Sequence, residues 1–162
     1  MSKKEKIIAE GALTIEIQKK LIGLAKGARI HAYAKYSHFK VGAALLCRNG
    51  NVYTGFNIEN SSYSATICAE RVAFSCAIAN GEKDFTAIAV VGGNGIGIDK
   101  KNFASRSDAE ADTVKAITPC GVCRQFMSEF CDDGFTVITL SDDEENPTVY
   151  TLSELLPHSF RL

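Results

Sequence analysis

The chain has 162 residues, of which 46% are hydrophobic and 23% are charged, and its 18 basic and 19 acidic side chains give a formal net charge of -1. This length is typical of a single domain. The composition excludes a collagen, a coiled coil and a wholly disordered chain. The balanced charge offers no basic surface for nucleic acid or an anionic membrane, so we expect one domain over residues 1–162 with neither partner.

The N-terminal residues are basic but are not followed by the apolar stretch of a signal peptide. No window reaches the run of about 18 apolar residues that a membrane span requires. We therefore expect a cytoplasmic protein. In that reducing compartment the six cysteines are not expected to form disulfides.

Hydrophobic periodicity predicts the elements in chain order, after a loose arm of about a dozen residues. The Asn49-Gly50 pair indicates a hairpin turn, and residues 57–66 are polar and irregular. A mixed sheet with helices on its faces is expected from this order. The predicted elements are a helix at about 13–32, strands at 41–46 and 52–56, a helix from 68 to about 80, a strand at 86–91, a helix from 120 to about 131, a strand at 135–140 and a short helix at about 153–156.

The stretch from 92 to 117 is long, polar and rich in glycine at its start. Its glycines lack the spacing of a dinucleotide-binding fingerprint, and no apolar-periodic helix follows them. We interpret it as a loop insertion and assign it no ligand.

Two short motifs carry the residues that suggest chemistry, Cys68-Ala-Glu70 and Pro119-Cys-Gly-Val-Cys123. Each lies at the predicted start of a helix, where the partial positive charge lowers the pKa of a thiol. Two such termini directed at one point would bring together three thiolates, a donor set that zinc accepts readily. Three protein ligands leave one position open for water, as in catalytic zinc sites.

The residues beside these cysteines suggest further roles. Glu70 can reach the open position without being a ligand, and a carboxylate there can act as general base and then general acid. Arg71 can hydrogen-bond to the sulfurs and offset their charge. As helix caps we expect Thr118, with Pro119 in the first turn, and either Ser64 or Thr66.

Longer strings around these motifs resemble the small cytidine deaminases of nucleoside salvage, and the two motifs match the zinc deaminase signature. The resemblance covers about residues 20–162, apart from the insertion. The matching strings are Tyr36-Ser-His-Phe-Lys-Val-Gly-Ala-Ala44, Asn57-Ile-Glu-Asn60, Cys68-Ala-Glu-Arg71, Pro119-Cys-Gly-Val-Cys-Arg-Gln125 and Glu154-Leu-Leu-Pro157.

The resemblance implies an α/β fold, a three-layer α/β/α sandwich with a five-stranded mixed sheet. It implies hydrolysis of cytidine and deoxycytidine to uridine and deoxyuridine with loss of ammonia, in a homotetramer with one zinc ion per subunit. Its implied residue roles are zinc binding by Cys68, Cys120 and Cys123, proton transfer by Glu70, ribose binding by Asn57 and Glu59, packing on the pyrimidine by Phe39, base recognition through the backbone of Ala69, and contributions across a subunit boundary from Tyr63 and Phe160.

Other interpretations remain open from the residues alone. The cysteines could be buried thiols, or a structural zinc site with a fourth ligand from Cys76, Cys131 or a histidine. Glu70 could simply complement a helix dipole, and Asn57 and Glu59 could be turn residues. The alternative functions are a deaminase of another aminopyrimidine nucleoside such as blasticidin S, a polynucleotide cytosine deaminase and a non-catalytic zinc module.

Overall fold

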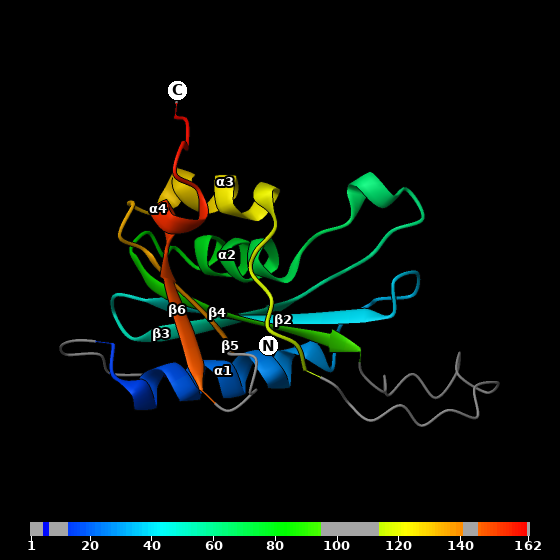
Figure 1. The fold of residues 1–162 in the computed structure, drawn as a ribbon, viewed down its shortest axis with the longest axis horizontal. Helices are drawn as coiled ribbons and strands as arrows, with labels where there is room; N and C mark the ends of the chain where they lie inside the picture. The colour runs from blue at the N-terminus through cyan, green and yellow to red at the C-terminus, as the bar shows by residue number, and fades with distance from the viewer. Residues whose placement is uncertain (1–4, 7–12, 95–113, 141–145, 162) are drawn as a thin grey trace.

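A mixed β-sheet forms the middle layer of the computed structural model, which describes residues 5–6, 13–94, 114–140 and 146–161. The strand order is β1-β3-β2-β4-β5-β6. Helix α1 covers one face, and α2, α3 and α4 lie on the other (Figure 1). The elements are β1 (Glu5–Lys6), α1 (Ile15–Arg29), β2 (Phe39–Cys47), β3 (Asn51–Phe56), a 3-10 turn (Tyr63–Ala65), α2 (Ala69–Ala79), β4 (Phe85–Asn94), α3 (Gly121–Phe130), β5 (Thr136–Leu140), β6 (Pro147–Thr151) and α4 (Leu152–Leu155).

The predicted α/β/α sandwich is confirmed, with β2 to β6 as its five main strands. The predicted hairpin is also present: β2 and β3 pair antiparallel, and Gly50 adopts a φ of 84° in the turn between them. Glycine tolerates this left-handed conformation without steric cost. β4 pairs antiparallel with β2 and parallel with β5, which makes the sheet mixed.

Periodicity missed two strands. β6 begins at Pro147, which lacks an N–H group, and a proline is accommodated there because it opens an edge strand. β1 pairs two residues of the expected N-terminal arm with the outer side of β3. The acidic run at 142–145 lies outside the described residues.

The central strands carry apolar side chains on both faces, because each face of the sheet packs against a layer of helices. In β2, Ala43 and Leu45 contribute to the core under α2 and α3, whereas Ala44 and Leu46 contribute to the core over α1. This alternation follows from the two-residue period of a strand. Phe74 of α2 is fully buried and contacts four aromatic rings, those of Phe85, Phe126, Phe130 and Phe135.

Two glycines let the helices approach the sheet closely. A Cβ on Gly42 would lie 2.1 Å from the carbonyl oxygen of Ala25 in α1. A Cβ on Gly55 would lie 2.3 Å from the carbonyl oxygen of Ala69 in α2. Because Ala69 directly follows Cys68, the second contact sets the depth at which this cysteine lies above the sheet.

The two ends of the predicted insertion lie side by side. Gly92 to Asn94 belong to β4, and the backbone N–H of Lys115 donates to the carbonyl of Gly92 at 2.8 Å. Residues 95–113 lie outside the described part, so the single domain with an inserted loop stays a prediction. Among the described helices, none combines the length and the apolar character needed to cross a membrane.

Replacing Gly55 by alanine should destabilise the protein, because the added methyl group would meet backbone atoms that cannot move alone. Overpacking of this kind costs about 1–3 kcal/mol in the free energy of unfolding, which urea denaturation measures. The control is Gly27→Ala in α1, where the added Cβ meets no atom within 4 Å and helix propensity favours alanine. A Gly55→Ala variant as stable as the parent would contradict the close packing of α2 on β3.

Candidate metal and active site

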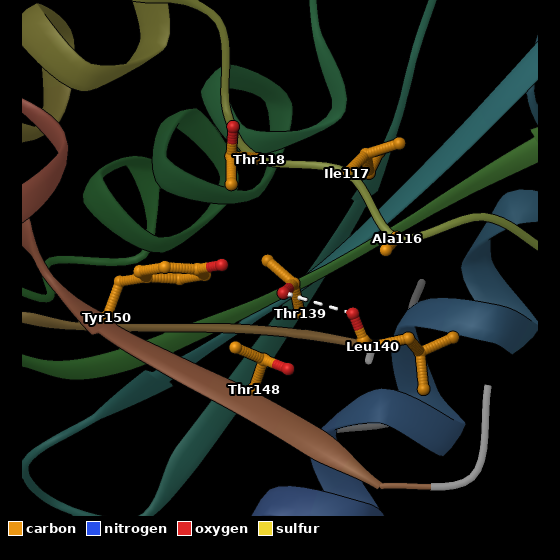
Figure 2. A pocket seen from close by; sticks show the side chains of 7 residues that line it. All are labelled: Ala116, Ile117, Thr118, Thr139, Leu140, Thr148 and Tyr150. Carbon is orange, nitrogen blue, oxygen red and sulfur yellow. Dashed lines mark hydrogen bonds between the residues drawn. The ribbon is translucent and has the colours of Figure 1, made fainter. Parts of the chain in front are cut away.

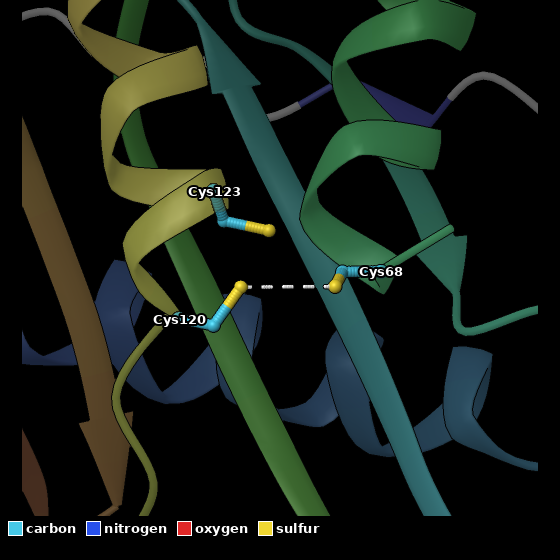
Figure 3. A group of neighbouring side chains, drawn as sticks. All are labelled: Cys68, Cys120 and Cys123. Carbon is cyan, nitrogen blue, oxygen red and sulfur yellow. Dashed lines mark hydrogen bonds between the residues drawn. The ribbon is translucent and has the colours of Figure 1, made fainter. Parts of the chain in front are cut away.

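Three cysteines converge from the N-termini of two helices. Cys68 is the N-cap of α2, Cys120 is the N-cap of α3, and Cys123 lies in the first turn of α3. Their sulfur atoms all lie within 4.8 Å of one another, and the Sγ atoms of Cys68 and Cys120 are 3.9 Å apart. The three sulfurs point into one space between the helices (Figure 3).

The predicted capping residues are wrong, because the cysteines themselves occupy the cap positions. Thr118 instead accepts a hydrogen bond from Arg124 at 2.9 Å, and Ser64 lies within the 3-10 turn. Thr66 precedes the α2 cap by two residues. The side chains of Cys68 and Cys120 make no capping hydrogen bond, but the partial positive charge of a helix N-terminus favours a negatively charged sulfur there.

Hydrogen bonding within the cluster moves the pKa values of Cys68 and Cys123 in opposite directions. The hydrogen bond from the Cys123 thiol lowers the pKa of Cys68 to about 5, against the opposing effect of burial, and Arg71 and Cys120 lower it further. The same hydrogen bond and burial raise the pKa of Cys123. Arg71 Nη2 lies 3.9 Å from Cys68 Sγ and donates to the carbonyl of Thr66 at 2.8 Å.

The donor set fits a zinc ion. Tetrahedral zinc with bonds of about 2.3 Å to sulfur places two sulfurs about 3.8 Å apart, close to the separation of Cys68 and Cys120. Within the described residues, which include every cysteine and histidine, the cluster contains no fourth cysteine, histidine or carboxylate. Cys76 and Cys131 are therefore outside it, which weighs against a four-ligand structural site.

Glu70 lies in the first turn of α2 with only 4% of its surface exposed. Burial raises the pKa of Glu70 to about 7, and the negative charge of Cys68 adds to this, although hydrogen bonds to the carboxylate oppose it. A carboxyl group with a pKa near neutrality can both accept and donate a proton. Its position beside the sulfurs makes it the candidate for proton transfer.

The side chain of Asn57 forms hydrogen bonds with the backbone at the start of β2. Its Oδ1 accepts from the N–H of Val41 at 2.8 Å, and its Nδ2 donates to the carbonyl of Phe39 at 2.9 Å. The side chain is buried, with 8% of its surface exposed. Both polar atoms of this amide are therefore hydrogen-bonded to backbone groups, which gives Asn57 a structural role whatever else it binds.

Glu59 is a buried carboxylate surrounded by donors. It accepts hydrogen bonds from the N–H groups of Tyr36, at 2.7 Å, and Ser37, at 3.2 Å, and from the Ser37 hydroxyl. Burial acts to raise the pKa of Glu59, but these hydrogen bonds and the charge of His38 outweigh it and hold the pKa below its usual value. Glu59 is therefore ionised at neutral pH.

A backbone bridge connects this segment to the cysteine cluster. The N–H of Glu59 donates to Tyr33 at 2.8 Å, and Ile58 and Ile67 exchange two backbone hydrogen bonds. Ile67 directly precedes Cys68. The stretch predicted to be irregular is thus a hydrogen-bonded link, which fixes Asn57 and Glu59 relative to the first cysteine.

Phe39 is the first residue of β2, and its ring lies across Gly92 of β4. A Cβ on Gly92 would be 2.7 Å from Phe39 Cε1 and 2.5 Å from Ile117 Cδ1. The absence of a side chain at this position leaves room for both groups. Sequence analysis assigned no role to Gly92, because only the pairing of β2 with β4 places it under Phe39.

The remaining predicted residues differ in burial. Ala69 is fully buried between Cys68 and Glu70 in the chain. Tyr63 and Phe160 are 60% and 66% exposed, and Gln125 of α3 donates to the carbonyl of Phe160 at 2.8 Å. Within a single chain, then, the rings of Tyr63 and Phe160 are open to contact from outside.

Arg124 is a supporting residue that sequence analysis did not single out. Its guanidinium donates to the carbonyl of Pro119 at 2.6 Å, to the hydroxyl of Thr118 and to the carbonyl of Leu155 at 2.7 Å. These bonds fix the segment that leads into Cys120 against the end of α4. Its sequence signals are its place directly after Cys123 and its inclusion in the matching string from Pro119 to Gln125.

A hollow of about 360 Å³ lies between this segment and strands β5 and β6 (Figure 2). It adjoins the residues leading to Cys120 but is lined by none of the predicted site residues. We therefore treat it as separate from the cysteine cluster. Its lining consists of Ala116, Ile117, Thr118, Thr139, Leu140, Thr148 and Tyr150.

Residues 15–139 match the family model of the cytidine and deoxycytidylate deaminase zinc-binding region. The chain belongs to this deaminase family. A cytidine deaminase from Sporosarcina psychrophila is 44% identical over 143 residues, which cover 87% of this chain and 89% of that protein. The crystal structure of cytidine deaminase from Burkholderia pseudomallei is 39% identical, with a TM-score of 0.70 over 88% of this chain and 98% of that one.

A more distant deaminase relative bears on the alternative substrate. The blasticidin-S deaminase of Bacillus cereus is 30% identical over 117 residues, which cover 72% of this chain and 74% of that protein. The resemblance deduced from the sequence motifs is thus confirmed at the level of the family, and the cysteine cluster is the group in this deaminase that suits a zinc ion.

Replacing Glu59 by glutamine should destabilise this deaminase at pH 7 and progressively less in acid. Because the folded state holds the pKa of Glu59 below the unfolded value, its contribution is complete above that unfolded value and is lost as pH falls through the folded pKa. Hydrogen bonds to charged groups contribute about 1.5–3 kcal/mol each. Urea unfolding from pH 7 down to pH 3 measures the change, because the contribution is lost only below the unfolded pKa of about 4.3.

The control is Glu129→Gln, which replaces an exposed carboxylate of α3. The stability of the Glu129→Gln variant relative to the parent should change little over the same pH range. A Glu59→Gln deficit that stays constant with pH would contradict the ionised, hydrogen-bonded state assigned to Glu59.

Proposed function

We propose that the chain is a zinc-dependent deaminase of cytidine and deoxycytidine, with one zinc ion per subunit held by Cys68, Cys120 and Cys123. The products are uridine or deoxyuridine and ammonia, as in pyrimidine salvage. The observation that carries the proposal is the buried carboxyl of Glu70 beside three converging thiols, in a chain that belongs to the cytidine and deoxycytidylate deaminase family.

A zinc ion held by Cys68, Cys120 and Cys123 would lower the pKa of water and so would supply an activated nucleophile at neutral pH. Glu70 takes a proton from the attacking water and gives one to the amino group that leaves C4 of the pyrimidine. Its burial suits both steps, because the pKa of Glu70 is raised to about 7. Arg71, beside Cys68, offsets part of the negative charge of the thiolates.

The nucleoside is held by residues that precede the cysteine motif. Asn57 and Glu59 hydrogen-bond to the ribose hydroxyls, Phe39 packs against the pyrimidine ring, and the backbone of Ala69 contacts the base. The ionised state of Glu59 supports this assignment, since a carboxylate is a strong acceptor for hydroxyl groups.

The assembly we propose is a homotetramer in which Tyr63 and Phe160 complete the site of a neighbouring subunit. Their large exposed fractions in the single chain support this, because exposed aromatic side chains are typical of interfaces. None of the six cysteines forms a disulfide, which supports a reducing cytoplasmic location.

Blasticidin S is the second candidate substrate, because a blasticidin-S deaminase is among the relatives. Its 30% identity is lower than the 44% of the Sporosarcina cytidine deaminase, so we favour the plain nucleosides. A polynucleotide substrate is disfavoured by the net charge of -1, since single strands bind in basic grooves.

Ammonia release from a panel of substrates tests the proposal. The zinc-loaded protein is incubated with cytidine, deoxycytidine, cytosine, blasticidin S and a short cytosine-containing single strand. We expect turnover of the two free nucleosides alone. Turnover of blasticidin S or of the strand in their place, or release of ammonia from none of the five, would overturn the proposed substrate.

Replacing Glu70 by glutamine should preserve zinc binding and reduce kcat by a factor of at least about 10²–10⁴, the range of general acid–base catalysis. Zinc content by elemental analysis and ammonia release provide the two measurements. The exposed Glu129→Gln variant on α3 is the matched control and should retain the parental rate. Parental activity in the Glu70→Gln variant would remove Glu70 as the proton carrier.

A further inference from the structure

The turn from Tyr36 to Phe39 enters β2 in a conformation that needs support. His38 has a φ of 57°, in the left-handed region that residues other than glycine seldom adopt. Such a conformation persists when the surrounding contacts determine it. The turn is held by hydrogen bonds from the N–H groups of Tyr36 and Ser37 to the buried Glu59, and from the N–H of Phe39 to the Ser37 hydroxyl. The N–H of His38 itself donates to the carbonyl of Ala34 at 3.1 Å.

Ser37 joins two residues of the proposed nucleoside site. Its hydroxyl donates to Glu59 Oε1 and accepts from the N–H of Phe39 at 3.0 Å. Its own backbone N–H donates to the second oxygen, Glu59 Oε2, at 3.2 Å. One small side chain therefore bonds to both the Glu59 carboxylate and the backbone of the aromatic residue, and it contributes to the position of each.

Phe39 is fixed from both sides of its backbone. Its N–H donates to the Ser37 hydroxyl, and its carbonyl accepts from the Asn57 amide. The ring lies over Gly92, where the absence of a side chain leaves room for it. Removal of the Ser37 hydroxyl takes away one of these two supports.

The hydrogen bonds to Glu59 also determine how it can receive a ligand. A carboxylate offers about four acceptor sites, and the bonds from Tyr36 and Ser37 occupy three of them. Two of these bonds end on Oε2 and one on Oε1. The Ser37 hydroxyl bonds to Oε1 and the two N–H groups bond to Oε2, so together they fix the rotation of the carboxylate and the direction of the acceptor site that is left.

We propose that Ser37 is a positioning residue for nucleoside binding, which orients the Glu59 carboxylate toward the ribose hydroxyls and sets the Phe39 ring against the base. The proposal rests on the proposed function. Ser37 has no contact with the cysteine cluster in the described hydrogen bonds, so it acts on substrate affinity rather than on the chemical step.

A comparison of two substrates separates this role from a general structural one. Ser37→Ala should raise KM for cytidine about tenfold, equivalent to about 1.4 kcal/mol, and change kcat less than about threefold. For 2′,3′-dideoxycytidine, which lacks the ribose hydroxyls but keeps the base, the same variant should raise KM less than about threefold, which is the part of the effect that acts through Phe39. Ser37→Thr retains the hydroxyl and should restore KM for cytidine to near the parental value.

A double-mutant cycle in urea unfolding provides a test that does not depend on activity. If Ser37 and Glu59 form one unit, Ser37→Ala and Glu59→Gln should not act independently on the folding equilibrium constant. The factor by which the double variant lowers this constant should be at least about fivefold smaller than the product of the two single-variant factors. An unchanged KM for cytidine, equal KM increases on both substrates, or an additive cycle would each overturn the proposal.

The two proposals fail in different ways. A zinc-loaded parent that does not deaminate cytidine overturns the proposed function, and with it the role of Ser37 in binding this nucleoside. The cycle would still decide whether Ser37 positions Glu59. Normal cytidine turnover combined with an additive cycle overturns the role of Ser37 alone.

Discussion

The site depends on one constraint, the convergence of two helix N-termini on three sulfur atoms. Cys68 and Cys120 occupy the N-cap positions of α2 and α3, where unpaired backbone N–H groups favour negative charge. The sheet imposes this convergence because both helices pack on the same face, and Gly55 admits the first turn of α2 against β3. Without that close approach, the thiols of the two motifs would not share one space.

The surrounding residues are positioned by backbone pairing rather than by a rigid element of their own. Ile58 pairs with Ile67, which directly precedes Cys68, and Glu59 pairs with Tyr33 after the end of α1. Asn57 and Glu59 then extend these links to the entry of β2 through their side chains. Displacement of the proposed nucleoside segment would therefore also disturb the first cysteine.

Sequence patterns predicted the parts of the molecule that depend on local spacing. The Cys-x-Glu and Cys-x-x-Cys motifs identified the cluster because residues three apart near a helix start face the same way. The caps were mispredicted, since a cysteine in the cap position carries no local signal. β6 was missed because Pro147 and the acidic run before it resemble a turn. The links of Ile58, Ser37 and Gly92 join segments that are distant in sequence, so only the assembled sheet reveals them.

The most direct test of the account is X-ray absorption at the zinc edge of the zinc-loaded chain. We predict one zinc ion per chain with three sulfur neighbours at about 2.3 Å and one lighter neighbour at about 2.0 Å. Four sulfur neighbours would indicate a closed structural site. That result, or a chain that retains no zinc, would contradict the claim that Cys68, Cys120 and Cys123 form an open metal centre.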